Sequence, residues 1–263
     1  MAATSPQVPV VNAGELYING LHISQNSLNP EQHLNVTRGA ARNSSNVNDI
    51  VLQNDLIVKI DRRGANGLDS GTLQDERLYA VFIIGSSIGL IGNGQENTKY
   101  PTAGLLSLSF DRPTMPFGYD MFRRIGTIAI DSVGEIQPFQ QVGNSVNRDM
   151  LYGGSFPVLT SGNATDYTDV FLNQGNECVP DLATNVYLLV TYVADNVNNV
   201  FRLRPSGSDA AYFYLGNVQI VGTGVLMYAT CPCNNSAFIS YEIDDDAVGN
   251  SLSISVVGFK DLL

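Results

Sequence analysis

The sequence has 263 residues, 44% of them hydrophobic, which is enough for one large or two ordinary globular domains with cores of their own. Only 15% of the residues are charged, and 25 Asp and Glu against 14 Lys and Arg give a formal net charge of −11. This charge opposes the phosphate neutralisation on which nucleic-acid binding depends, so we expect no nucleic-acid partner.

Because charged residues are few, the polar surface has to come mainly from Asn, Ser, Thr, Gln and Gly. Such a profile is typical of strands joined by tight turns and not of helices that carry Glu–Lys pairs. We therefore expect a mostly β protein with little helix.

The N-terminal stretch has no basic segment followed by an apolar one, and no apolar run approaches the roughly 20 residues of a membrane helix. The sequence thus predicts neither a signal peptide nor membrane insertion. Three cysteines are an odd number and too few for a disulfide framework, which indicates the reduced, partly buried thiols of a protein made in a cytosol.

The first part of the chain predicts an arm and a hairpin. Residues 1–13 contain two prolines and read as an extended arm of the kind that becomes ordered on a neighbouring molecule. Asn19-Gly20 then lies between alternating apolar residues, and Asn-Gly favours the type I′ turn of a two-residue β-hairpin. We expect this turn to pair Ile18 with Leu21.

Asp49–Leu52 and Leu56–Asp61 read as extended segments, and two further strands are predicted before the middle of the chain. Leu78–Ile84 is a nearly continuous apolar run, which is typical of a strand buried on both faces. Leu105–Phe110 predicts the next strand, ahead of two prolines that interrupt regular structure.

The segment from Thr114 to Phe139 predicts a second hairpin with a basic pair at its entrance. In a strand of period two, Arg124 lies on one face and Thr127 on the other. Turn residues occupy positions 131–134, and residues 136–139 are expected to return as the second strand.

Two stretches, residues 142–147 and 152–155, supply turn formers and suggest a domain boundary. We place the two β domains at residues 14–145 and 146–263, and the second half predicts an antiparallel β-sandwich or jelly roll. Its expected strands are Thr168–Leu172, Val186–Ala194, Val200–Pro205, Ala211–Leu215, Val218–Val221, Val225–Cys231, Phe238–Ile243 and Leu252–Phe259.

Several linked motifs in the first half resemble a module of tailed-phage and prophage structural proteins, usually described as tail-fibre or virion proteins. In chain order they read NVTRGAARNSSNVNDIVL, GLDSGTL, LYAVFII and RPTMPFGYDMFRRIGTIAIDSVGEIQPF. The chain departs from the module where Asn43 replaces its Asp and where Ser70 replaces its Thr. The resemblance covers roughly Leu34 to Phe139, and a weaker likeness to C-terminal β-domains of phage proteins covers parts of the second half.

The resemblance implies a non-enzymatic structural component of a virion, made in the host cytoplasm and assembled as a homo-oligomer, with a trimer as the implied state. A tail, collar or fibre appendage is the first expectation, and a capsid cement or decoration protein that stabilises the head is the alternative. A receptor- or glycan-binding tip that recognises host surface glycan is a second alternative. The implied partners are other copies of the chain and other virion proteins, and no cofactor is expected.

Few residues suggest catalysis or metal binding. His22 and His33 are the only histidines, and both read as surface residues, not as members of a catalytic triad. Glu242, Asp244 and Asp246 would share one face of a strand and are weak candidates for a hard cation, although the segment lacks the spacing of a calcium loop.

Basic residues stand out in a chain this acidic. Arg123, Arg124, Arg202 and Arg204 are candidates for contacts with acidic groups of an adjacent subunit. The alternative is intramolecular ion pairing at strand ends, worth about 0–1 kcal/mol for each exposed pair.

Overall fold

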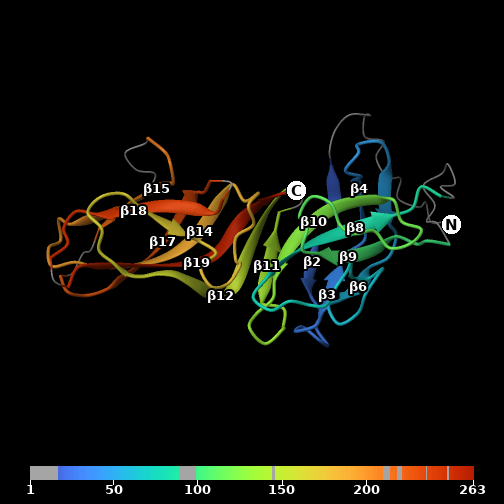
Figure 1. Cartoon of the computed structure of the whole chain (residues 1–263), viewed down its shortest axis with the longest axis horizontal. Coiled ribbons are helices and arrows are strands. Elements are labelled where there is room, and N and C mark those ends of the chain that lie inside the picture. The colour runs from blue at the N-terminus through green and yellow to red at the C-terminus, as the bar shows by residue number, and fades with distance from the viewer. Residues whose placement is uncertain are drawn as a thin grey trace, which may run out of the picture.

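The computed structural model describes residues 17–88, 99–143, 146–209, 214–217, 221–234, 236–247 and 249–263. Within these residues the strands form five sheets without an α-helix, which confirms the predicted mostly-β fold. Figure 1 shows two lobes along the long axis, with the C-terminus between them. The described residues contain no helix of the length and hydrophobicity that crossing a membrane requires.

The first lobe contains three sheets. The first is built from β1 (Ile18–Gly20), β4 (Gly39–Arg42) and β5 (Asp49–Leu52). The second is built from β2 (Ile23–Gln25), β3 (His33–Val36) and β6 (Leu56–Lys59). The third has the order β10 (Met121–Ala129), β8 (Leu78–Gly85), β9 (Ala103–Ser107) and β7 (Gly67–Leu68).

Strand β8 lies at the centre of this lobe, between β10 and β9, and every residue of the strand is buried. The apolar run at Leu78–Ile84 therefore forms the doubly covered strand that the sequence predicts. Gly104 of β9 lets this sheet approach β6, because a Cβ atom there would collide with the side chain of Val58.

The hairpin predicted at Asn19-Gly20 is wrong. Strand β1 pairs with β4, and β2 pairs with β3, so the chain passes from one sheet to another at this point. A type I′ turn needs positive φ at both Asn19 and Gly20, whereas the positive φ values fall at Gly20 (67°) and Leu21 (55°). Local turn propensity is overridden because each strand finds a longer-range partner.

The second predicted hairpin is correct at its turn and for only a short way beyond it. The N–H of Asp131 donates to the carbonyl oxygen of Glu135 at 2.9 Å across the turn. The returning chain pairs briefly, through an antiparallel bridge between Ile136 and Ile130 and a 2.9 Å hydrogen bond from the N–H of Gln137 to the carbonyl of Ala129. It then leaves β10, which pairs with β8, and enters β11 (Phe139–Val142), which pairs with β12. Strand β10 also has a bulge between Arg124 and Gly126, so the predicted alternation of faces breaks at this position.

The second lobe is a sandwich of two antiparallel sheets. One sheet has the order β11, β12 (Asn147–Gly162), β19 (Ser251–Leu262), β14 (Asn185–Val193) and β17 (Val225–Pro232). The other has the order β13 (Thr168–Phe171), β18 (Phe238–Ile243), β15 (Val200–Pro205) and β16 (Tyr214–Asn217). Alternate residues of β14 are buried, and Tyr192 of this strand meets Phe201 of β15 edge to face at 5.4 Å.

Most strands predicted in the second half are present within a few residues of the expected bounds. Residues 210–213 and 218–220, on which two of the predictions fall, lie outside the described residues, as does the predicted arm at residues 1–13. The sequence did not predict β12, whose 16 residues run through the turn-rich stretch proposed as a boundary.

The two lobes share buried structure. A single cluster of buried apolar side chains includes Ile125 from β10, Met150 from β12 and Phe259 from β19. Strand β11 precedes the boundary proposed at residue 145, yet it is an edge strand of the second lobe's sheet. The chain therefore passes from the first lobe to the second between β10 and β11.

Candidate functional site

Arg124 of β10 is buried and forms an ion pair with the carboxylate of Asp261, near the end of β19. The Nη1–Oδ1 distance is 2.7 Å, and Asp261 has no exposed surface. Thr127 donates its hydroxyl to the other carboxylate oxygen at 2.8 Å, and Arg124 also donates to the carbonyl of Leu262. Arg124 and Thr127 reach the same carboxylate because the bulge breaks the alternation that would otherwise separate them.

Arg123 contacts the last residue of the chain. Its Nη2 donates to the carbonyl oxygen of Leu263 at 2.8 Å. Burial, and then the neighbouring charge of Arg124, lower the pKa of Arg123. The two consecutive arginines of β10 thus hold the end of β19 against the first lobe.

Arg148 of β12 is the largest fully buried side chain among the described residues. Its guanidinium donates to the carbonyl oxygens of Gly20 (2.6 Å), Leu21 (2.8 Å) and Ile125 (3.1 Å), and to Oε1 of Gln141 (3.0 Å). Burial lowers the pKa of Arg148 to about 10, with Asp261 opposing the shift, so the group remains protonated at neutral pH. The interior tolerates the charge of Arg148 because its guanidinium donates to these four acceptors.

We call the group of Arg123, Arg124, Arg148 and Asp261 the arginine junction. It connects β10 and the Gly20–Leu21 turn of the first lobe to β12 and β19 of the second. Two lobes that meet through a small polar surface are expected to move relative to one another. Here the shared apolar cluster and the buried, directional hydrogen bonds of the junction oppose such movement.

Because Arg123 and Arg124 are buried, they are poorly placed for the subunit contacts that the sequence suggested. Each has 6% of its surface exposed, and both are engaged by the chain's own C-terminal strand. The intramolecular alternative left open by the sequence is the arrangement seen for these two residues. Little of either side chain is accessible to a second subunit.

Arg148 and Asp261 were missed by sequence reasoning. Arg148 lies between two stretches that read as turns, and Asp261 looks like an ordinary polar residue near the end of the chain. A usable signal is the position of each in its strand: both share the period-two face of buried neighbours, Met150 for Arg148 and Phe259 for Asp261.

The acidic candidates Glu242, Asp244 and Asp246 do not share a strand face, because β18 ends at Ile243. Arg202 contacts two of them, with its Nη1 3.0 Å from Glu242 Oε1 and 2.5 Å from Asp244 Oδ1. A guanidinium therefore occupies the position in which a cation would neutralise these carboxylates. Among the residues that the structure describes, no group of three potential ligands is arranged to hold a metal ion.

Arg204 lies on the same strand as Arg202, β15, with its guanidinium carbon 3.5 Å from the centroid of the Tyr167 ring. Arg202 and Arg204 thus both have intramolecular contacts, but they are only half-buried. They remain the accessible members of the predicted subunit-contact set.

The two histidines lie in the first lobe and are both half-buried. The backbone N–H of His22 donates to Thr37 Oγ1 at 2.9 Å. Burial, and then the charge of Arg148, lower the pKa of the His22 imidazole. The surroundings of His22 therefore disfavour its protonated form. This fits a structural role for His22 beside the arginine junction.

Replacing His22 by glutamine should reduce the loss of stability on acidification. The folded-state pKa of His22 is lowered, so below the ordinary value of 6.5 the unfolded chain binds a proton that the folded chain does not. The free energy of unfolding therefore falls as the pH drops from 6.5 toward the folded-state pKa. Urea unfolding at pH 7.5 and pH 5.5 should show a smaller decrease for His22→Gln than for the natural chain; an equal decrease would contradict the assignment.

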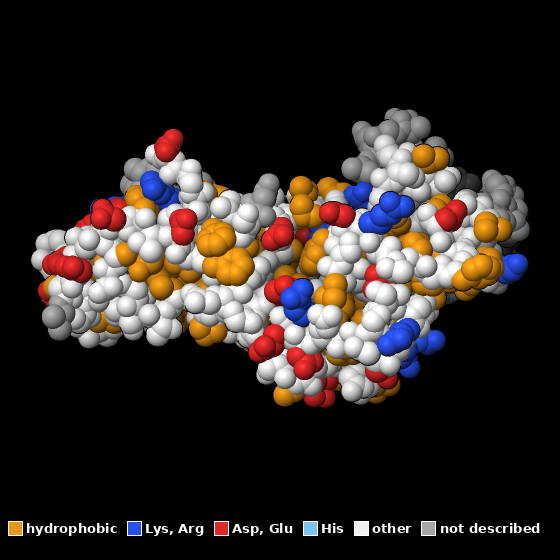
Figure 2. Space-filling view, in the orientation of Figure 1, with side chains coloured by type: hydrophobic (Ala, Val, Ile, Leu, Met, Phe, Trp, Pro, Cys, Tyr) orange, Lys and Arg blue, Asp and Glu red, His pale blue; other side chains and the backbone are white. Residues whose placement is uncertain are grey.

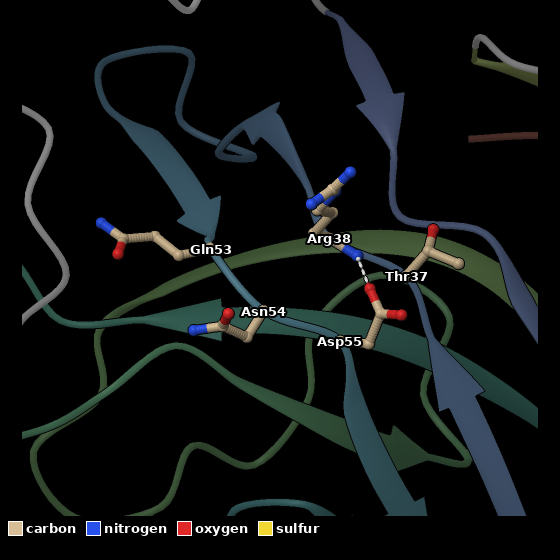
Figure 3. A pocket seen from close by; sticks show the side chains of 5 residues that line it. All are labelled: Thr37, Arg38, Gln53, Asn54 and Asp55. Atoms are coloured by element: carbon tan, nitrogen blue, oxygen red, sulfur yellow. Dashed lines mark hydrogen bonds between the residues drawn. The ribbon is translucent and has the colours of Figure 1, made fainter. Parts of the chain in front are cut away.

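A polar hollow of about 610 Å³ lies between the β3–β4 and β5–β6 connections of the first lobe. It is lined by Thr37, Arg38, Gln53, Asn54 and Asp55, whose side chains Figure 3 shows around it. Its single carboxylate, on Asp55, accepts a hydrogen bond of 2.7 Å from the backbone N–H of Arg38. The lining contains neither a second carboxylate nor a nucleophile–base pair, so this hollow has no arrangement for hydrolysis.

Comparison with known proteins adds no further assignment, because no protein-family model and no curated protein matches the chain.

Proposed function

We propose that this chain is a non-enzymatic structural component of a tailed-phage virion. Its place is in a tail, collar or fibre appendage, where it assembles through β-rich contacts between subunits. The linked motifs from Leu34 to Phe139 support the proposal, together with an all-strand fold in the described residues.

The arginine junction is the observation on which this proposal depends. A fixed connection between the two lobes would keep the two ends of an appendage in one relative orientation. In this chain three arginines fasten the lobes, and Asp261 and several backbone carbonyl groups accept from them. The acidic, sparsely charged surface fits contacts with other proteins better than contacts with nucleic acid.

The proposal is tested by gold-labelled antibody against the chain, applied to intact particles of the phage that encodes it and viewed by electron microscopy. We expect label on the tail or neck. Label over the head would instead favour a capsid cement protein, and label at a fibre tip would make saturable binding of host polysaccharide the next measurement. Unlabelled particles, in infections where the protein is made, would overturn the structural assignment.

A further inference from the structure

The polar hollow between the β3–β4 and β5–β6 connections does not belong to the arginine junction. Its volume of about 610 Å³ falls within the range of about 300–1,000 Å³ that is usual for small-molecule sites. The described lining has no hydrophobic side chain and consists of Thr37, Arg38, Gln53, Asn54 and Asp55. Thr37 is half-buried and the other four are exposed, so a ligand can reach them from solvent.

The walls of the hollow are fixed by hydrogen bonds of the backbone. The two connections are joined where Oδ1 of Asp55 accepts from the N–H of Arg38 at 2.7 Å. Thr37 is held to His22, because its N–H donates to the carbonyl of His22 and its hydroxyl accepts from the N–H of His22, both at 2.9 Å. A ligand therefore meets an ordered backbone, which lowers the entropic cost of binding.

The side chains around the hollow have unused hydrogen-bonding groups. Within the described residues, four groups of the lining make no hydrogen bond or ion pair: the guanidinium of Arg38, the amides of Gln53 and Asn54, and Oδ2 of Asp55. Figure 3 shows the two amides extending to the same side. Each amide offers donors and an acceptor, the guanidinium offers donors only, and the carboxylate offers acceptors only. The hollow thus presents both kinds of group to one ligand.

The charges of the lining disfavour an ionic ligand. Arg38 and Asp55 have opposite charges, and the described residues show no ion pair between their side chains. An anion beside the guanidinium would also meet the carboxylate, and a cation beside the carboxylate would meet the guanidinium. A hydroxyl group can accept from the first and donate to the second. Figure 2 shows basic, acidic and uncharged side chains interspersed over the first lobe, so neither sign of charge dominates the face that it draws.

We propose that this hollow binds a neutral saccharide, through a pyranose residue whose neighbouring hydroxyl groups bridge Arg38, Asp55 and the two amides. A pyranose meets the requirement because its ring has several hydroxyl groups and no charge, whereas an aliphatic or aromatic ligand would find no apolar wall in this lining. The inference goes beyond the proposed function, because an appendage can assemble without binding a saccharide. The test uses purified protein, so its failure and a failure of the antibody labelling are distinguishable.

The first measurement is saturation-transfer NMR of the full chain with neutral monosaccharides, namely glucose, galactose, mannose, rhamnose and N-acetylglucosamine. We expect at least one of them to bind with a Kd of about 1–10 mM, because exposed groups exchange hydrogen bonds to water for hydrogen bonds to the ligand with a small net gain. If none of these sugars binds at concentrations above this range, the proposal is wrong.

The double variant Arg38→Met with Asp55→Asn should weaken this binding by about tenfold or more, because it removes the guanidinium donors and both charges. Both side chains are exposed, so the fold is expected to persist. The matched control is Asp111→Asn with Arg112→Met, which makes the same changes at exposed residues of the β9–β10 connection, outside the lining. The control should bind like the natural chain, and equal binding by the two double variants would overturn the assignment of the site.

The second measurement locates the ligand on the chain. In an isotope-labelled chain, the side-chain amide resonances of Gln53 and Asn54 should shift as the bound monosaccharide is added, and each is identified by its loss in Gln53→Ala or Asn54→Ala. Inorganic phosphate at the same concentration should leave them unshifted, because the Asp55 carboxylate opposes an anion beside the guanidinium. Shifts confined to other residues, or larger shifts with phosphate than with the saccharide, would contradict the proposal.

Discussion

Replacing Asp261 by alanine should lower the free energy of unfolding by about 3–5 kcal/mol, the cost of removing one partner of a buried ion pair. Asp261 has no exposed surface and accepts from Arg124 at 2.7 Å and from Thr127 at 2.8 Å. In the variant the Arg124 guanidinium keeps its charge at a buried position without its carboxylate partner. Its backbone contact with Leu262 is too little to compensate.

Urea unfolding at pH 7 measures this loss, with Asp244→Ala as the matched control. Asp244 also pairs with an arginine, but 32% of its side chain is exposed, so its removal should cost at most about 1 kcal/mol. The double replacement Arg124→Met with Asp261→Leu should be less destabilised than Asp261→Ala, because it leaves no buried charge unpaired. If Asp261→Ala and Asp244→Ala lower the free energy of unfolding equally, the buried pair stabilises the fold no more than the exposed one.

Arg148→Met should destabilise the chain by a similar amount, about 3–5 kcal/mol. Methionine fills part of the space but cannot donate to the carbonyl groups of Gly20, Leu21 and Ile125. Each buried acceptor left without a donor costs roughly 1–3 kcal/mol, and removal of the buried charge offsets part of the sum.

The same unfolding experiment tests this prediction, with Arg202→Met as its control. Arg202 is half-buried and its two carboxylate partners lie near the surface, so its replacement should cost about 1 kcal/mol or less. Limited proteolysis gives an independent reading, since loss of Arg148 should expose the segment around Gly20 first. If Arg148→Met unfolds at the same urea concentration as the natural chain, the junction does not fasten the lobes.

Local composition was enough to predict strands that are rich in apolar residues over a short length. Leu78–Ile84 is apolar throughout and is covered on both sides, and Phe238–Ile243 agrees with its predicted bounds. These segments were predicted correctly because a short apolar run bounded by turn residues favours a strand. Strand β12 escaped prediction because Gly153, Gly154 and Ser155 resemble a turn; in the structure they form an irregular stretch between Leu151 and Phe156, the residues on either side that pair with β19.

Prediction of the candidate site was less complete. The basic pair Arg123-Arg124 was recognised as unusual, but its partner could not be identified, because Asp261 is 137 residues away from Arg124 in the chain. A strict period of two also places Arg124 and Thr127 on opposite faces, and only the bulge brings them together. Pairings of this separation depend on the arrangement of whole sheets and leave no short-range signal.

The amino-acid sequence by itself determined the fold class, because few charges, many turn formers and apolar segments of period two favour strands over helices. It also determined most strand positions in the second half. Only the tertiary structure decided which strands pair, since Asn19-Gly20 has a hairpin sequence and yet joins two sheets. It likewise decided the arginine junction, because a charge is stable in the interior only where distant parts of the chain bring all its partners together.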